Sequence, residues 1–176
     1  MDQIQIISCD ALPEKSALNS LLKEYYTLIV ARMRSIGVTI DQSAPDNALA
    51  EFWLHASKYL PPNGCLVIAK TQSGEIVGCG MLKKMDSETG ELKRVYVTEA
   101  ARGTGTGRKI IEMREAVARQ MGLTRLVADT LSPNVEMRSL YPKLGFREVF
   151  EPLPTMTYVD EPSLRPHMHF FVKDLT

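Results

Sequence analysis

The chain reads Glu91-Leu92-Lys93-Arg94-Val95-Tyr96-Val97 and, five residues later, Arg102-Gly103-Thr104-Gly105-Thr106-Gly107. The first stretch predicts a strand, and the second predicts a glycine-rich turn that leads into a helix. Free backbone N–H groups and a partial positive charge make the start of a helix a ready anion site. Glycines let the backbone approach a phosphate and adopt φ > 0 without a clash at Cβ. Together, the two stretches predict a phosphate-binding loop between a strand and a helix.

Elements on both sides of the loop follow from hydrophobic periodicity and turn residues. Three strand-like runs, 65–69, 75–82 and 91–97, are separated by short turns, which predicts an antiparallel meander. After the loop, a helix ending at Gly122 and a strand at 125–129 predict a crossover and hence a parallel pair. The other predicted elements are an edge strand at 4–8, helices between Pro13 and Gly37, at 46–60 and at 135–144, and closing strands at 146–150 and 169–172, with a proline-rich loop at 151–166. The predicted fold class is α/β: a mixed, mostly antiparallel central sheet with helices on both faces.

Length and composition set further bounds. The 176 residues suit one domain with its own core, and a hydrophobic fraction of 44% suits a globular protein. Basic and acidic residues number 21 each, so the zero net charge does not favour nucleic-acid or anionic-membrane partners. Cys9, Cys65 and Cys79 form no CxxC pair, which favours a reducing, cytoplasmic location. The N-terminus predicts no signal peptide, and no apolar stretch approaches the ~20 residues that span a membrane.

Two common phosphate motifs do not fit the loop. A Walker loop that starts at Gly103 requires glycine at its sixth position, where the chain has Arg108. A dinucleotide fingerprint requires glycine at the same position, and it follows the first strand of a doubly wound sheet rather than a meander. The loop is therefore built for another phosphate ligand.

The pattern that does fit is Arg-x-x-Gly-x-Gly, formed by Arg102, Gly105 and Gly107. This loop resembles the coenzyme A pyrophosphate loop of the GNAT acetyltransferase superfamily. Asn134 and the later stretch 140–146, Leu-Tyr-Pro-Lys-Leu-Gly-Phe, resemble a second signature of that family. The resemblance covers nearly the whole chain. It implies that residues 1–176 form a single N-acetyltransferase domain that uses acetyl-CoA as cosubstrate, and family members often form homodimers.

The motif strand shows a break in its side-chain alternation. Leu92 sits at an even position, whereas Val95 and Val97 sit at odd ones, so one buried face cannot hold all three without a register slip. A β-bulge near Lys93-Arg94 would cause the slip, and burial on both faces is the alternative. The resemblance implies a bulge here, which splays this strand from the parallel strand so that the pantetheine arm enters the gap.

The resemblance also assigns roles to individual residues. Tyr141 would protonate the coenzyme A sulfur, or else pack its helix on the sheet. Glu91 would act as the base, directly or through water, or else be a solvated strand-end charge paired with Lys93 or Arg94. Asn134 would touch the cofactor or cap a helix. The residues that would bind coenzyme A are Val95, Tyr96, Val97, Arg102, Gly103, Thr104, Gly105, Thr106, Gly107, Arg108 and Asn134.

The leading hypothesis is an acetyl-CoA-dependent N-acetyltransferase that acts on an amine of a small molecule or peptide by direct transfer. A non-catalytic acyl-CoA-binding or sensing module is the alternative, and a nucleotide or NAD binder is a third reading. The histidines show no metal-ligand spacing, so no metal is expected. Pro142 inside the predicted helix 135–144 is expected to break or kink it beside Tyr141.

Overall fold

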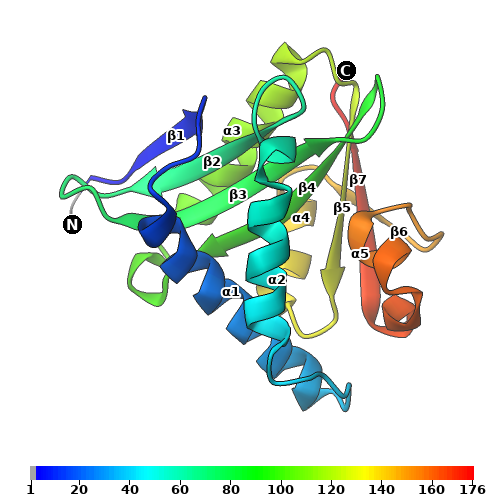
Figure 1. The fold of residues 1–176 in the computed structure, drawn as a ribbon. Coiled ribbons are helices and arrows are strands. Elements are labelled where there is room, and N and C mark those ends of the chain that lie inside the picture. Colours follow the sequence, from blue (N-terminus) through cyan, green and yellow to red (C-terminus); the bar gives the residue numbers. More distant parts are fainter. Residues whose placement is uncertain (1–2) are drawn as a thin grey trace.

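The computed structural model describes residues 3–176, which form one seven-stranded sheet with helices around it (Figure 1). Met1 and Asp2 lie outside the described residues. They belong to the predicted domain 1–176 and to the N-terminal segment in which no signal peptide is predicted. The strands are β1 (Gln5–Cys9), β2 (Gly64–Lys70), β3 (Ile76–Lys84), β4 (Thr89–Val97), β5 (Arg125–Leu131), β6 (Arg147–Val149) and β7 (Met168–Asp174).

The sheet order is β1-β2-β3-β4-β5-β7-β6. Every neighbouring pair is antiparallel except β4 and β5, which run parallel because α3 (Thr106–Gln120) crosses between them. This arrangement confirms the predicted meander, the parallel pair and the mixed α/β class. No helix of residues 3–176 combines the length and apolar character that crossing a membrane requires.

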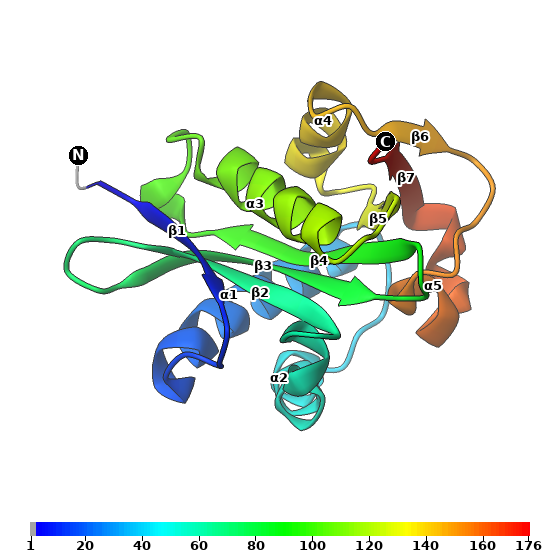
Figure 2. The same ribbon diagram turned by 90° about the horizontal axis from the view of Figure 1, so that it is seen from above.

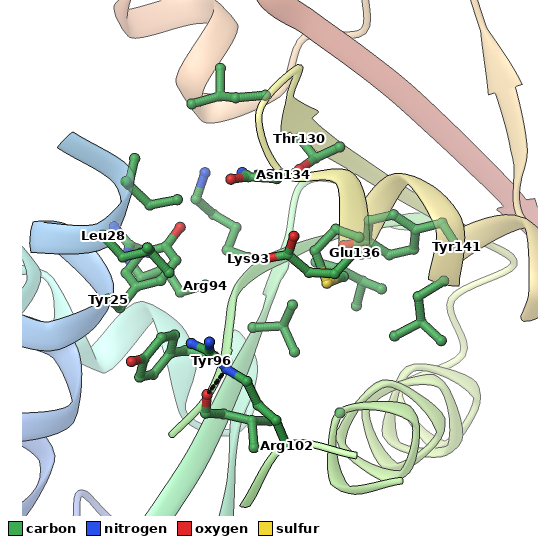
Figure 3. Close-up of a pocket in the computed structure, with 18 of the residues that line it drawn as sticks. Tyr25, Leu28, Lys93, Arg94, Tyr96, Arg102, Thr130, Asn134, Glu136 and Tyr141 are labelled. Atoms are coloured by element: carbon green, nitrogen blue, oxygen red, sulfur yellow. Dashed lines mark hydrogen bonds between the residues drawn. The ribbon is translucent and has the colours of Figure 1, made fainter. Parts of the chain in front are cut away.

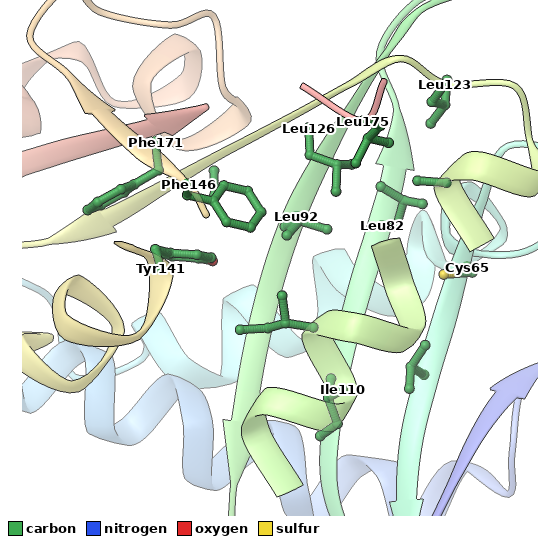
Figure 4. Packing of buried hydrophobic residues seen from close by; sticks show 14 of the residues in the cluster. Cys65, Leu82, Leu92, Ile110, Leu123, Leu126, Tyr141, Phe146, Phe171 and Leu175 are labelled. Carbon is green, nitrogen blue, oxygen red and sulfur yellow. The ribbon is translucent and has the colours of Figure 1, made fainter. Parts of the chain in front are cut away.

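Helices cover both faces of the sheet (Figure 2). The helices α1 (Lys15–Ser35) and α2 (Ala44–Leu54) lie on one face, and α3 and α4 (Val135–Lys143) lie on the other. One apolar core, which includes Leu18, Leu22 and Phe52, fills the α1/α2 side. A second core fills the α3/α4 side, where Ile110 and Tyr141 pack with apolar residues of the sheet (Figure 4).

Two segments differ from the sequence-based predictions. The second helix was expected to reach residue 60, but α2 ends at Leu54 and a 3₁₀ turn, η1 (Ala56–Tyr59), follows. The segment expected to be a proline-rich loop contains α5 (Met156–Asp160) and a 3₁₀ helix, η3 (Pro162–His167). Proline is tolerated in the first turn of a helix, so prolines here mark helix starts rather than continuous loop.

A β-bulge interrupts β4, which is one of the two explanations that the alternation of Leu92, Val95 and Val97 left open and the one that the family resemblance implied. Two steps along β3, from Cys79 to Met81, face three steps along β4, from Tyr96 back to Lys93. Inside the bulge, Arg94 adopts φ 49°, which is uncommon outside glycine. As a result, Leu92, Val95 and Val97 all pack in the α3/α4-side core, which excludes the alternative of burial on both faces.

Arg114 of α3 stabilises the bulge from the α3/α4 side. Its fully buried guanidinium donates through Nη1 to the carbonyl oxygens of Met81 (2.9 Å) and Lys93 (3.1 Å). Gly80 leaves room for this side chain, since a Cβ there would lie 2.9 Å from Arg114 Nε and 2.6 Å from Ile110 Cγ2. The buried arginine thus satisfies backbone oxygens at a point where the strand ladder is irregular.

The bulge is followed by a split in the sheet. Pairing of β4 with β5 extends from Thr89↔Arg125 to Leu92↔Ala128 and then stops. Beyond the bulge, Tyr96 and Val97 of β4 pair with β3, whereas none of the residues 95–97 pairs with β5. The predicted splay between the motif strand and the parallel strand is therefore present.

Candidate active site

A cavity of about 530 Å³ lies at the split between β4 and β5 (Figure 3). Its wall combines the β4 bulge and the end of β5 with side chains of α1 and α4 and the glycine loop before α3. Of the residues expected to bind coenzyme A or take part in catalysis, those that line it are Val95, Tyr96, Val97, Arg102, Gly103, Gly105, Thr106, Gly107, Arg108, Asn134 and Tyr141. Thr104 and Glu91 are not part of the lining.

The glycine loop has the backbone geometry that an anion site requires. Gly103 and Gly105 adopt φ values of 76° and 79°, which a side chain would strain. Gly105 is the N-cap of α3 and provides no side-chain cap, so the first N–H groups of the helix are free for a ligand. Space is open where a Cβ would stand at either glycine, which lets a phosphate approach the backbone.

Thr104 acts inside the loop rather than at the cavity wall. Its Oγ1 donates to the carbonyl oxygen of Ala101 (2.7 Å) and lies 2.7 Å from Oγ1 of the buried Thr106. These two hydrogen bonds tie the turn together at the point where α3 begins. Thr104 therefore shapes the loop from within.

Two arginines flank the loop. The Nε of Arg102 donates to the carbonyl oxygen of Val97 (3.2 Å), and its guanidinium lies 5.8 Å from the centre of the Tyr96 ring. Arg108 lies 3.7 Å from Glu112 on the same exposed face of α3. Both guanidinium groups are exposed beside the helix start, where they can pair with phosphate oxygens.

Tyr141 owes its position to the end of α4. The N–H of Phe146 bonds the Tyr141 carbonyl oxygen (3.1 Å) and the N–H of Gly145 bonds that of Pro142 (3.1 Å), with Gly145 at φ 84°. This pair of hydrogen bonds is the Schellman pattern of a helix end. Pro142 stands in the last turn of α4 and neither ends the helix before Lys143 nor removes Tyr141 from the cavity, contrary to the expected break.

The Tyr141 ring packs between Phe146 and Phe171, with ring centres 5.0 and 5.1 Å away (Figure 4). Burial raises the pKa of the Tyr141 phenol to about 12, although the nearby Arg114 guanidinium favours the phenolate. The phenol is thus held protonated at neutral pH and can donate a proton or a hydrogen bond into the cavity.

Asn134 occupies the N-cap position of α4, yet its side chain makes no cap hydrogen bond. Its Oδ1 instead accepts from Arg32 Nη1 of α1 (2.8 Å), and its Nδ2 donates to Thr130 Oγ1 of β5 (3.2 Å). The same Arg32 nitrogen lies 2.5 Å from a carboxylate oxygen of Glu136. Asn134 therefore helps to link α1 with α4 across the mouth of the split.

Glu91 is buried, with 1% of its surface exposed. Its Oε1 accepts from Lys93 Nζ (3.0 Å) and from the backbone N–H of Met156 (3.0 Å). Lys93 extends from β4 into the cavity (Figure 3), whereas Glu91 is not part of the cavity lining. The expected pairing with Lys93 is present, but the expectation of a solvated strand-end charge is wrong, since Glu91 is buried inside β4. The role of Glu91 as a base stays a prediction.

Sequence reasoning did not assign four charged residues of the site. Lys93 and Arg94 both face the α1/α2 side because the bulge turns consecutive residues to one face, a consequence of the alternation break. Asp129 ends the apolar run of β5 and lines the cavity. Arg114 stands four residues after Ile110 on the apolar stripe of α3, and a charge there is itself a signal of a buried partner.

Comparison with known proteins finds similarity to acetyltransferases. A model of the acetyltransferase (GNAT) family matches residues 19–146. An uncharacterized N-acetyltransferase of Schizosaccharomyces pombe is 24% identical over 143 residues, which are 78% of this chain and 86% of that protein. An IAA acetyltransferase of Azospirillum brasilense is 35% identical over 98 residues, 52% of this chain and 63% of that one.

A similar fold is present in the crystal structure of the PaiA N-acetyltransferase of Thermoplasma acidophilum in complex with coenzyme A. The TM-score is 0.70 at 14% sequence identity, with 97% of this chain and 99% of that chain covered. At this identity the likeness concerns the fold alone.

Proposed function

Because the chain belongs to the acetyltransferase (GNAT) family, we propose that it transfers the acetyl group of acetyl-CoA directly to an amine. The observation that carries this proposal is a single cavity that joins the glycine loop to Tyr141 through the split between β4 and β5. A phosphate ligand at the loop would extend along the split towards this phenol. The acceptor would enter from the α1 side, so that residues of one acetyltransferase domain supply both binding regions.

The donor side would hold coenzyme A in two regions. The first N–H groups of α3, together with Arg102 and Arg108, would bind the phosphates. The β4 residues 95–97, which lack partners in β5, would bind the pantetheine amides through their backbone. Arg102 would release the Val97 carbonyl oxygen when it turns to a phosphate, which frees that oxygen for an amide N–H.

Acetyl-CoA supplies the acetyl group as a thioester, and the chain's own groups manage charge and protons. A bond forms between the amine nitrogen and the carbonyl carbon, the C–S bond breaks, the nitrogen loses a proton and the sulfur gains one. Tyr141 would give its proton to the sulfur and regain one released by the nitrogen. A free N–H of the β4 residues 95–97 would stabilise the negative charge that develops on the carbonyl oxygen.

Glu91 would act as a positioning residue in this reaction. Its carboxylate binds Lys93 and lies outside the cavity wall, so contact with the amine would require a water molecule or a movement of Lys93. By fixing the Lys93 ammonium, Glu91 would set the charge that the acceptor meets at the split.

The proposal is tested with the purified chain, acetyl-CoA and a panel of amines, by following release of the free thiol. We expect amine-dependent release, and a thermal shift with coenzyme A that is absent with NAD or ATP. Coenzyme A bound at 100 times its Kd should stabilise the fold by about 2.7 kcal/mol. Binding without turnover on any amine would support the non-catalytic alternative, and absence of a shift with coenzyme A would exclude both.

A further inference from the structure

The charges around the acceptor side of the cavity do not cancel locally. Within residues 3–176, Arg94 has no carboxylate within ion-pair distance; its Nε and Nη1 bond instead to the hydroxyls of Tyr26 (2.7 Å) and Tyr59 (2.5 Å). Its Nη2 makes no hydrogen bond with the described residues, and Arg94 is one of the residues that line the cavity. A partly buried cation without a counter-ion is costly, and a bound anion would remove that cost.

The opposite imbalance exists beside Lys93. Its ammonium is bonded to Glu91, and their side chains are only 7% and 1% exposed. Asp129 of β5 lines the cavity close to the same ammonium, and its Oδ2 is buried without a hydrogen-bond partner. Glu91 is thus the carboxylate in ion-pair contact with this ammonium, and Asp129 has no cation within ion-pair distance among the described residues, which leaves its negative charge for a cationic ligand to neutralise.

Tyr25 of α1 connects the two regions. Its ring lies beside Arg94 (Figure 3), and the charges of Arg94 and Asp129 act on its phenol in opposite directions. Arg32, the other cation of α1 at this wall, is already neutralised by Glu136. On the acceptor side of the cavity, away from Arg102 at the glycine loop, the unpaired positive charge is thus Arg94 and the unpaired negative charge is Asp129.

We propose that the acceptor is a small molecule that carries both a primary amine and a carboxylate, with the ammonium bound at Asp129 and the carboxylate at Arg94. This inference rests on the proposed acetyl transfer and names the acceptor class of the same site. The ammonium gives one proton to the Asp129 carboxylate, which passes it to solvent, and the neutral amine then reacts as described above. A peptide N-terminus or a protein lysine side chain lacks the adjacent carboxylate and fits the site less well.

Two properties of Asp129 agree with this role. Burial raises its pKa above that of an ordinary aspartic acid, while the Lys93 ammonium limits the rise and Glu91 adds to it. A raised pKa makes the carboxylate a better proton acceptor. The nearby Thr155 and Thr157 favour its charged form, so it remains available to bind a cation.

The experiment compares matched acceptors: amino acids such as alanine, leucine and phenylalanine against their amides and decarboxylated amines, with acetyl-CoA held constant. We expect kcat/KM to be at least about tenfold higher for the acids. The amide of an amino acid has the less basic amine, so more of it is neutral and its intrinsic reactivity works against this result. Equal or better turnover of the amides and amines would overturn the acceptor class and leave the acetyltransferase activity standing.

Substitutions at the cavity wall show which residue causes the preference for acids over amides. Arg94→Gln should bring the acid-to-amide ratio of kcat/KM close to one, and Arg94→Lys should restore part of it. Arg32→Gln combined with Glu136→Gln, which removes a neutral ion pair from the same wall, should keep the original ratio. Asp129→Asn should lower turnover of all acceptors while the ratio persists. Arg94 also bonds two core tyrosines, so its substitution removes core contacts as well as a charge. A second readout therefore uses the unaltered protein: its coenzyme A complex should bind an amino acid more tightly than the matching amide.

These outcomes separate the two levels of inference. If no acceptor of any class is acetylated while coenzyme A binds, the proposed function fails and the acceptor class fails with it. If turnover occurs and Arg94→Gln keeps the acid preference, the assignment of the carboxylate to Arg94 is wrong.

Discussion

Tyr141 is placed by contacts that its neighbours in sequence create. The Schellman end of α4 brings Phe146 against its ring, and Phe171 of β7 covers the other side. Desolvation in this setting makes the phenol a weaker acid than in water. The residue therefore combines a fixed direction with a retained proton, which are the two requirements of a general acid.

Replacing Tyr141 by Phe should remove the proton donor and keep the ring packing. We expect kcat to fall by at least about 100-fold, with little change in Kd for acetyl-CoA or in Tm. Steady-state kinetics measures kcat, and a thermal melt of the same preparation measures Tm. An unchanged kcat would exclude Tyr141 as the acid.

The pH profile offers a separate check on the same group. With a pKa of about 12, Tyr141 stays protonated through the accessible range, and only its ionised form is inactive. We therefore expect kcat of the unaltered protein to show no decline from this group until the pH approaches that value. A basic limb near the ordinary phenol pKa of about 10, absent from Tyr141→Phe, would contradict the raised pKa.

At the scale of elements, the glycine loop contains two glycines with different reasons to be there. Gly105 needs its positive φ to begin α3, whereas Gly107 lies inside the helix, where a Cβ would meet only Val97 Cγ2 at 3.8 Å. The fold itself requires the first glycine but not the second. Gly107 is useful only if a ligand comes close to the backbone.

The two alanine variants should therefore behave differently. Gly105→Ala should lower the free energy of unfolding by about 1–2 kcal/mol because of its left-handed φ. Gly107→Ala should leave stability equal or up to about 1 kcal/mol higher, yet weaken coenzyme A binding. Urea unfolding measures the stability of both variants, and calorimetric titration measures their affinity for coenzyme A. Unimpaired binding in Gly107→Ala would argue against phosphate at this helix start.

The β4 bulge depends on a contact from another element. Gly80→Ala would place a methyl group against Ile110 and Arg114, so we expect a loss of about 1–3 kcal/mol in unfolding free energy. Displacing Arg114 from the Lys93 carbonyl oxygen should also weaken coenzyme A binding. Gly107→Ala is the control for stability. A fully stable Gly80→Ala protein with normal binding would show that the bulge does not need Arg114.

At the scale of the whole molecule, the sheet consists of two parts with few direct links. The strands β1–β4 meet the group β5, β7 and β6 only through the pairing of residues 89–92 with 125–128. Across the mouth, Arg32 of α1 reaches Asn134 and Glu136 at the start of α4. A ligand seated in the split would contact both parts and hold them together.

Coenzyme A should therefore slow amide hydrogen exchange on both sides of the split. We expect added protection at residues 95–97 of β4 and at the first turn of α3, and little change in β1 and β2. Mass-spectrometric exchange with and without coenzyme A measures this. Protection confined to the loop would mean that the ligand does not enter the split.

Much of the architecture could be predicted because its signals are local. Periodicity and turns located the meander, the crossover helix and the closing strands, and the alternation break in β4 located the bulge. The end of α2 and the helices within 151–166 were missed because short segments rely on packing that local patterns do not record. Pro142 was expected to break or kink the helix, but α4 ends one residue later at Lys143, so the turns that carry Tyr141 are formed before the proline.

By itself, the sequence determined the family-defining loop and the order of elements, because each depends on residues within a few positions of one another, and it made Tyr141 a candidate. Only the tertiary structure decided how the charges combine: Glu91 with Lys93, Arg32 with Glu136, and Arg94 and Asp129 left in excess at the cavity wall. These groups come from α1, β4, β5 and α4, which are far apart in the chain. Their balance depends on distance and burial, and those quantities exist only once the sheet has formed and split.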